Sequence, residues 1–262
     1  MTAPDPSAAP VPPVPAATLL LLRDGTPGLE VLMMVRHDTA NFAGGAMVFP
    51  GGKVEPADGV VAARHLAGGA AEEAGLLALK IAAIRETFEE CGILLARKQG
   101  AATVLSPAER APVAPGGLDF AALLAAHRLE PAIDLLVPLA NWITPVMSPK
   151  RFDTHFFVAN VSSDQIAAGD GREAVEVVWT TPLAVMAEAD AGRRLLLPPT
   201  YLNLKKLAGC ATVEAAIALA RSSAIVPVTP VLVRGESGPE LHIPEAAGYG
   251  LTRYPAPKFL VR

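Results

Sequence analysis

The 262-residue sequence predicts an α/β fold of the mixed, α+β kind, in which helices and a mixed β-sheet form a compact sandwich. Two observations predict it. Segments with the periodicity of strands and of helices follow one another without the strict alternation of a doubly wound parallel fold. Hydrophobic residues make up 51% of the chain, which is ample material for one well-packed core.

Charge and cysteine content exclude several classes of protein. The formal net charge is −4, whereas a nucleic-acid-binding surface usually carries a clear basic excess. The two cysteines, Cys91 and Cys210, are too few for a disulfide framework and lack the spacing of a zinc site. We therefore expect buried thiols in a reducing compartment, a cytoplasmic protein, and no nucleic-acid partner.

The first sixteen residues, "MTAPDPSAAPVPPVPA", contain six prolines and no basic residue, which predicts a disordered tail. They lack the positive region of a signal peptide, and the apolar "ATLLLLR" that follows is too short to span a membrane. Residues 17–262 are expected to form a single domain. A homodimer is compatible with the sequence, and no membrane partner is expected.

The remaining elements follow from apolar periodicity and turn residues. Strands are expected within 17–37 (a hairpin turning at "DGTPG"), 46–50, 134–145, 154–161, 174–181 and 224–244 (a hairpin turning at "GESG"). Helices are expected at 77–91, 118–129, 182–192, 199–209 and 213–223. Residues 56–75 are small, polar or Ala-rich, and a loop with a short helical piece is expected there.

The helix at 77–91 carries an unusual group of acidic residues. Its apolar residues fall on one side, whereas Glu86 and Glu90 lie nearly opposite them with Glu89 alongside. Gly92 is placed to end the helix, so these carboxylates repel one another and the negative end of the helix dipole. A solvated acidic face is one interpretation. The other is a Mg²⁺ or Mn²⁺ site, because converging carboxylate oxygens are the ligands these cations prefer.

"FPGGK" at 49–53 and "RETFEECGI" at 85–93 together resemble the signature of the Nudix hydrolases, G-x5-E-x7-R-E-U-x-E-E-x-G-U, with U aliphatic. The matching positions are Gly52, Arg85, Glu86, Phe88, Glu89, Glu90, Gly92 and Ile93. The sequence departs from the signature at Asp58, where the family has glutamate. It also carries nineteen additional residues between Asp58 and Arg85. This insertion, at about 59–76, is expected to leave as a solvent-facing excursion and to keep Asp58 within ion-pair reach of Arg85.

An interrupted signature of this kind resembles the Nudix subgroup that acts on coenzyme A and acyl-CoA. The likeness extends to "NWITPVMSPKRFDTHFFVA", "GREAVEVVW" and "LPPT", and so covers most of residues 17–210. The resemblance implies an α/β/α sandwich with a mixed sheet. It also implies metal-dependent cleavage of a phosphoanhydride in a nucleoside diphosphate derivative. With coenzyme A or acyl-CoA as the substrate, the products would be 3′,5′-ADP and (acyl-)phosphopantetheine.

The resemblance also assigns site residues. Arg85, Glu86, Glu89 and Glu90 are the expected catalytic group. The three glutamates and the Gly52 carbonyl are expected to hold Mg²⁺ or Mn²⁺, and Asp58 to support Arg85.

Other residues have alternative interpretations. Arg36, Lys53 and Arg151 are candidates to bind substrate phosphates, although each could equally be a surface residue. Glu173 and Glu176 are candidate bases near the start of a strand. Trp142 and Phe152 could stack on a base or be buried.

Two alternatives to a coenzyme A diphosphatase remain open from the sequence. One is the same chemistry on ADP-ribose or a dinucleotide. The other is a non-catalytic ligand sensor with this fold, in which the insertion has displaced the loop that carries Asp58.

Overall fold

A computed structural model describes residues 10–26, 28–37, 44–66, 74–113, 119–169, 171, 173–236 and 238–256, without the side chains of 65 and 66. The main sheet has the strand order β10-β7-β8-β1-β2-β3, with β4 paired to β1 and β9 paired to β2. β1 pairs with β8 in parallel and with β2 and β4 in antiparallel orientation, so the sheet is mixed. The predicted fold class is therefore confirmed.

The strands of this sheet are β1 (Val14–Asp24), β2 (Leu29–Arg36), β3 (Met47–Val48), β4 (Gly51–Lys53), β7 (Val137–Ile143), β8 (Phe152–Asn160), β9 (Ala174–Thr180) and β10 (Pro227–Val228). Two smaller sheets contain β5 (Ala96–Lys98) with β6 (Leu129–Pro131), and β11 (Val231–Gly235) with β12 (Gly238–His242) and β13 (Arg253–Pro255). The helices are α1 (Pro56–Leu66), α2 (Ala74–Cys91), α3 (Pro107–Arg110), α4 (Phe120–Ala126), α5 (Pro182–Asp190), α6 (Pro198–Leu207) and α7 (Val213–Ser222), with 3₁₀ turns η1 (Ile133–Leu135) and η2 (Glu245–Ala247).

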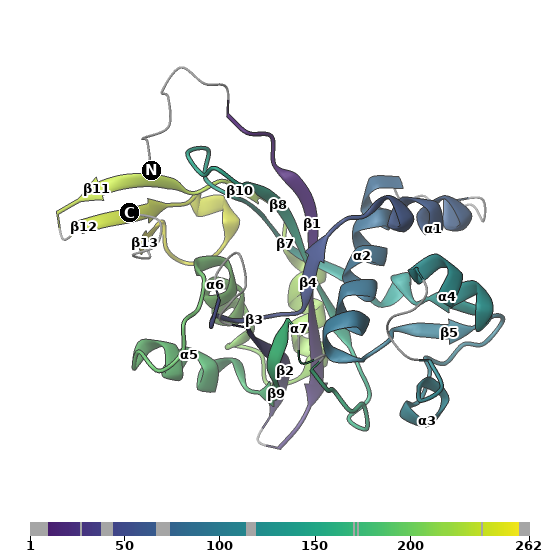
Figure 1. Cartoon of the computed structure of the whole chain (residues 1–262). Coiled ribbons are helices and arrows are strands. Elements are labelled where there is room, and N and C mark those ends of the chain that lie inside the picture. The colour runs from purple at the N-terminus through teal and green to yellow at the C-terminus, as the bar shows by residue number, and fades with distance from the viewer. Residues whose placement is uncertain are drawn as a thin grey trace.

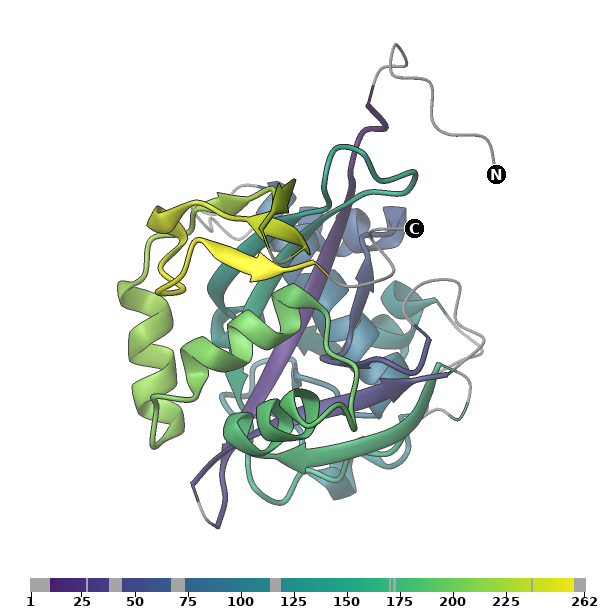
Figure 2. The same ribbon diagram turned by 90° about the vertical axis from the view of Figure 1, so that its left-hand side faces the viewer.

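The two faces of the main sheet are covered by different elements, as Figure 1 shows. Alternate residues of the central strand β1 enter two separate cores: Leu19 and Leu21 pack with α2 and α4, whereas Leu20 and Leu22 pack with α6 and α7. This alternation follows from the two-residue period of a strand. It explains why "LLLL" is continuously apolar, since both faces of β1 are buried. The face covered by α6, α7 and the sheet β11-β12-β13 is turned to the viewer in Figure 2.

Several expected boundaries are corrected by the structure. The predicted C-terminal boundary of the disordered tail, residue 16, is wrong. Val14, Pro15 and Ala16 already belong to β1 and pair with β8. The earlier residues 1–9 lie outside the described residues. Helix α2 begins at Ala74 rather than Leu77 and ends as expected before Gly92, whose φ of 69° is left-handed.

The expected loop at 56–75 is also corrected. Residues 56–66 form α1, and its Val61 and Ala62 are buried in the core that includes the apolar side of α2. The inserted segment therefore contributes a packed helix and is not wholly a solvent-facing excursion. Residues 67–73 lie outside the described residues. Within the part of the chain that is described, no helix is both long and apolar enough to span a bilayer.

Candidate active site

The short strand β4 brings the glycine pair against the acidic side of α2. Gly52 pairs with Ala17 of β1, and a Cβ added at Gly52 would overlap the carboxylate of Glu86. The N–H of Gly51 donates a hydrogen bond of 2.8 Å to Oε2 of Glu90. Glycine at position 52 leaves the carboxylate the space that a side chain would occupy. The sequence pattern identified Gly52 but did not assign a role to the N–H of Gly51.

Arg85 is the centre of a buried network that joins α2 to β4 and α1. Its Nε and Nη2 donate to the two oxygens of Asp58 at 2.9 and 3.0 Å, and its Nη2 also donates to the Lys53 carbonyl at 2.9 Å. Its Nη1 donates to Glu86 at 2.9 Å and to Glu89 at 3.1 Å. The predicted ion pair between Asp58 and Arg85 is thus confirmed despite the insertion between them.

Electrostatics keep this arginine charged. Burial would lower the pKa of Arg85, but the hydrogen bond with Asp58 and the charges of Glu86, Asp58 and Glu89 raise it well above its ordinary value. Arg85 consequently acts as a permanent cation that orients the carboxylates on either side of it.

Glu86 and Glu90 are not part of a solvated acidic face. Only 3% of Glu90 is exposed, and its Oε1 has no hydrogen-bond partner among the described residues. Burial raises the pKa of Glu90 to about 8, against the hydrogen bond from Gly51 and the charge of Arg36. Burial likewise raises the pKa of Glu86 to about 7, against the charge of Arg85 and the hydrogen bond from it. Both carboxylates are therefore short of compensating positive charge.

Glu89 is the more exposed third carboxylate. Its side chain is 46% exposed and is held by Arg85, while burial raises its pKa. The carboxylates are turned to Arg85 and Gly51. In this arrangement, no three His, Cys, Asp or Glu side chains among the described residues already surround one metal position. The donor set nevertheless fits a hard divalent cation, because the unpaired Oε1 of Glu90 and the carboxylate of Glu86, which shares Arg85 with Asp58 and Glu89, are oxygen ligands with too little positive charge around them.

Arg36 and Glu173 lie close enough to these carboxylates to affect their pKa values. Arg36 ends β2, and its Nη2 lies 3.9 Å from Oε2 of Glu173. The charge of Glu173 raises the pKa of both Glu86 and Glu90, and that of Arg36 lowers the pKa of Glu90. The structure thus brings these two sequence-predicted residues to the carboxylates. The Nε of Arg36 is buried and has no hydrogen-bond partner among the described residues.

Glu176 is not brought to this site. In the pairing of β2 with β9, Val35 is opposite Glu176, but the next residue, Arg36, is opposite Ala174. The register therefore shifts by one residue at this point, and Val175 forms a bulge. A bulge of this kind changes the direction of the side chains that follow it. Glu176 instead pairs with Arg194, whose Nη2 donates to both carboxylate oxygens of Glu176 at 2.9 Å. Of the two candidate bases, the structure brings only Glu173 near the carboxylates.

The other predicted ligand-binding residues have different surroundings. The side chain of Lys53 is exposed, and its backbone carbonyl accepts a hydrogen bond from Arg85. Arg151 is 8% exposed and donates to the carbonyls of Thr144 and Val11, which ties the chain before β1 to the loop before β8. The structure does not place Arg151 with the carboxylates, and its contacts indicate a structural role. Trp142 is buried and donates to the Tyr249 hydroxyl at 2.7 Å, so it is a core residue.

This chain is similar to proteins of a known family and to a known structure. Residues 64–207 match the family model of the NUDT19 Nudix domain. This match includes the charged residues of α2 and begins after Gly52 and Asp58. An acyl-coenzyme A diphosphatase NUDT19 from Xenopus laevis is 27% identical over 71% of this chain and 61% of its own length. A putative nudix hydrolase 7 from Caenorhabditis elegans is 30% identical over 68% of this chain and 55% of its own length.

These two relatives are longer than this chain, which spans less than two thirds of each. Among solved structures, the crystal structure of a NUDIX hydrolase from Alicyclobacillus acidocaldarius is similar at 32% sequence identity and a TM-score of 0.68. The similarity covers 79% of this chain and 96% of that one. The mixed α/β fold therefore has a counterpart of known structure.

Proposed function

Because this chain belongs to the Nudix hydrolases and matches their NUDT19 Nudix domain family, we propose that it hydrolyses the diphosphate of coenzyme A or acyl-CoA. Water would add to one phosphorus of the diphosphate, and the bridging P–O bond would break. The products are 3′,5′-ADP and phosphopantetheine or its acyl form, which together account for every atom of substrate and water.

The observation that carries the proposal is the arrangement of Glu86 and Glu90 against Gly51 and Gly52, with Arg85 locked to Asp58. A ligand sensor would have no need of two buried carboxylates without sufficient counter-charge, since each destabilises the fold. The sensor alternative also required the insertion to displace Asp58, and Asp58 lies within hydrogen-bond distance of Arg85. The similarity to acyl-coenzyme A diphosphatases supports the choice of substrate.

Each charged residue has a distinct role in the proposal. Glu86, Glu90, Glu89 and the Gly52 carbonyl would hold Mg²⁺ or Mn²⁺. When bound, such a cation supplies Lewis-acid polarisation of the diphosphate and favours ionisation of water. Arg85 fixes the orientation of Glu86 and Glu89 through its hydrogen bonds to Asp58 and Lys53. Arg36, with its unpaired buried Nε, would donate to a phosphate oxygen.

Glu173 is our candidate for the group that accepts the proton of the attacking water. Its side chain is 63% exposed, so an incoming substrate can reach it. It lies close enough to Glu86 and Glu90 for its charge to raise the pKa of each. Such a base needs to be within reach of the water and on the opposite side of the site from the leaving group.

A panel of substrates tests the proposal. Coenzyme A, acetyl-CoA, 3′-dephospho-coenzyme A, ADP-ribose and a diadenosine polyphosphate would each be incubated with Mg²⁺ and with Mn²⁺. Mass spectrometry would identify the products. We expect 3′,5′-ADP from coenzyme A or acetyl-CoA at higher kcat/KM than any product from the other compounds. Preferred cleavage of ADP-ribose or of the dinucleotide would reject the proposed substrate while retaining the chemistry.

A further inference from the structure

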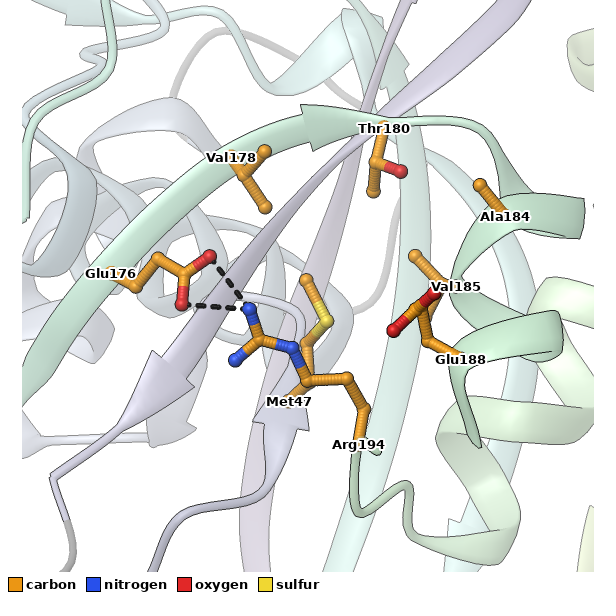
Figure 3. A pocket seen from close by; sticks show the side chains of 8 residues that line it. All are labelled: Met47, Glu176, Val178, Thr180, Ala184, Val185, Glu188 and Arg194. Carbon is orange, nitrogen blue, oxygen red and sulfur yellow. Dashed lines mark hydrogen bonds and ion pairs between the residues drawn. The ribbon is translucent and has the colours of Figure 1, made fainter. Parts of the chain in front are cut away.

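A second candidate site lies between β9, α5 and the segment that follows α5, on the other face of the sheet from α2. It is a cavity of about 190 Å³, and Figure 3 shows the side chains that line it. Met47, Val178 and Val185 supply apolar walls. The rim is polar and includes Thr180 and the ion pair of Glu176 with Arg194, which is drawn by dashed lines in Figure 3.

The cavity and the carboxylates are connected by one edge of the sheet. Val177 packs in the core that contains α2, whereas Val178 packs on the other face of β9, in the core that contains α6 and α7. Val178 lines the cavity, so the cavity is on the face of β9 opposite α2. Glu173 near the carboxylates and Glu176 in the cavity are three residues apart, or about 10 Å along a strand. Glu176 faces the cavity because it alternates along β9 with Val177, which faces α2. The bulge opposite Val35 and Arg36 lies between Glu176 and Glu173. Glu173 and Glu176 thus place the carboxylates and the cavity at the same end of β9, on opposite faces of the sheet.

The charges of the cavity restrict what it can bind. Glu176 is neutralised by Arg194, and Glu188 accepts two hydrogen bonds of 2.8 Å from Arg193. Each cation is thus matched by a carboxylate, and no surplus positive charge remains to hold a phosphate. The volume is too small for a pantetheine arm that carries an acyl chain. A planar, neutral heterocycle with amino donors and ring-nitrogen acceptors fits the apolar walls, the Glu176 carboxylate, the Thr180 hydroxyl and the face of the guanidinium.

We propose that this cavity binds the purine base of the substrate while the diphosphate lies at Glu86 and Glu90. The inference rests on the proposed function, because a nucleoside diphosphate derivative places its base one ribose and one phosphate away from the scissile bond. Thr180 and Glu176 become specificity residues in this arrangement, and Arg194 positions Glu176. The two aromatic residues considered from the sequence do not line this cavity: Trp142 is buried in the core, and Phe152 is not among the lining side chains.

Calorimetric titration of the full chain with ADP, with phosphopantetheine and with inorganic pyrophosphate, all in Mg²⁺, tests the proposal. Ala184 lines the cavity from α5 and is exposed, so Ala184→Phe fills the cavity without replacing a core side chain. Ala187→Phe, at an exposed position of the same helix that does not line the cavity, is the matched control. We expect Ala184→Phe to raise the Kd for ADP at least about tenfold and to leave the other two ligands unchanged.

Should Ala184→Phe fail to fold, Arg194→Ala gives a second cavity variant that is expected to weaken ADP binding. Arg221→Ala, at an exposed position of α7 away from the cavity, is its control and should leave ADP binding unchanged. Unchanged ADP binding in the folded cavity variants, weakened binding of phosphopantetheine instead, or no binding of ADP by the unmodified protein would overturn the base assignment. Because binding requires no turnover, the two proposals fail separately. A protein that binds ADP through the cavity but cleaves nothing in the substrate panel would reject only the proposed function.

Discussion

Asp58 and Arg85 form a two-point ion pair, with hydrogen bonds of 2.9 and 3.0 Å between groups that are 0% and 3% exposed. The two residues are separated by 26 positions in the sequence, where the Nudix signature has seven. The pair persists because Asp58 is in the first turn of α1, and α1 packs against α2. Residues 59–66 of the insertion thus extend a packed helix instead of separating the two charges.

Asp58→Ala is expected to destabilise the protein by about 3–5 kcal/mol, because it leaves the Arg85 guanidinium buried without its main counter-charge. Chemical denaturation followed by circular dichroism measures the change. Asp134→Ala is the control, since Asp134 is 62% exposed and its pair with Arg97 is worth at most about 1 kcal/mol. Equal effects of the two substitutions would contradict the structural role assigned to Asp58.

Glu90→Gln is expected to lower turnover by at least about 10²-fold, the scale of losing a principal electrostatic stabiliser. The substitution retains the size of the side chain and removes a buried charge, so the metal-free fold should keep or gain stability. Steady-state kinetics at saturating Mn²⁺ and a thermal melt check both statements. Glu214→Gln, on the exposed side of α7, serves as the control. Undiminished activity would exclude Glu90 from the site.

The metal-free protein is expected to lose stability as pH rises through the range from about 5 to 8. Burial raises the pKa of Glu90 from 4.5 to about 8 and that of Glu86 to about 7, so the folded state binds these protons more tightly than the unfolded state. The contribution of these two carboxyl groups to the free energy of unfolding is complete below pH 4.5, where both are protonated in the folded and the unfolded state. It is lost as pH rises through their folded-state pKa values. Thermal midpoints in EDTA at several pH values measure it. A Glu90→Gln protein with an equally steep pH dependence would contradict the assignment.

Gly52→Ala is expected to lower kcat/KM at least about tenfold, because the new Cβ would overlap the Glu86 carboxylate and force it to move. The overlapping atoms are the end of a flexible side chain, so the free energy of unfolding should change by less than about 1 kcal/mol. Gly59→Ala in α1 is the control. Nothing lies within 4 Å of its added Cβ, and it should stabilise the helix by about 0.5–1 kcal/mol without changing activity.

Arg36→Ala and Arg151→Ala are expected to act differently, although the sequence made both residues candidates for phosphate binding. Arg36→Ala should reduce kcat/KM for coenzyme A and for its 3′-dephospho form, because Arg36 lies at the carboxylates. Arg151→Ala should destabilise the protein and leave the ratio of the two rates unchanged, since its guanidinium donates to backbone carbonyls. A changed rate ratio for Arg151→Ala would restore it as a ligand of the 3′-phosphate.

The sequence by itself determined the sheet-and-helix architecture and the charged cluster of α2. Local signals suffice for these, because the apolar "LLLL" of β1, the stop at Gly92 and the spacing of Glu86, Glu89 and Glu90 are all encoded within one element. The pairing of Asp58 with Arg85 was also predictable, but only through a known signature.

Tertiary structure alone decided where the remaining residues lie. Arg36 ends β2, Glu176 lies in the neighbouring strand β9, and Glu173 directly precedes β9. A bulge that no sequence pattern indicated separates the two glutamates. Arg151 was assigned from charge, whereas its role depends on which carbonyls reach it. The cavity beside β9 combines residues from positions 47 to 194, so long-range packing creates it. Local propensity specifies the elements, and only their packing specifies which side chains share a site.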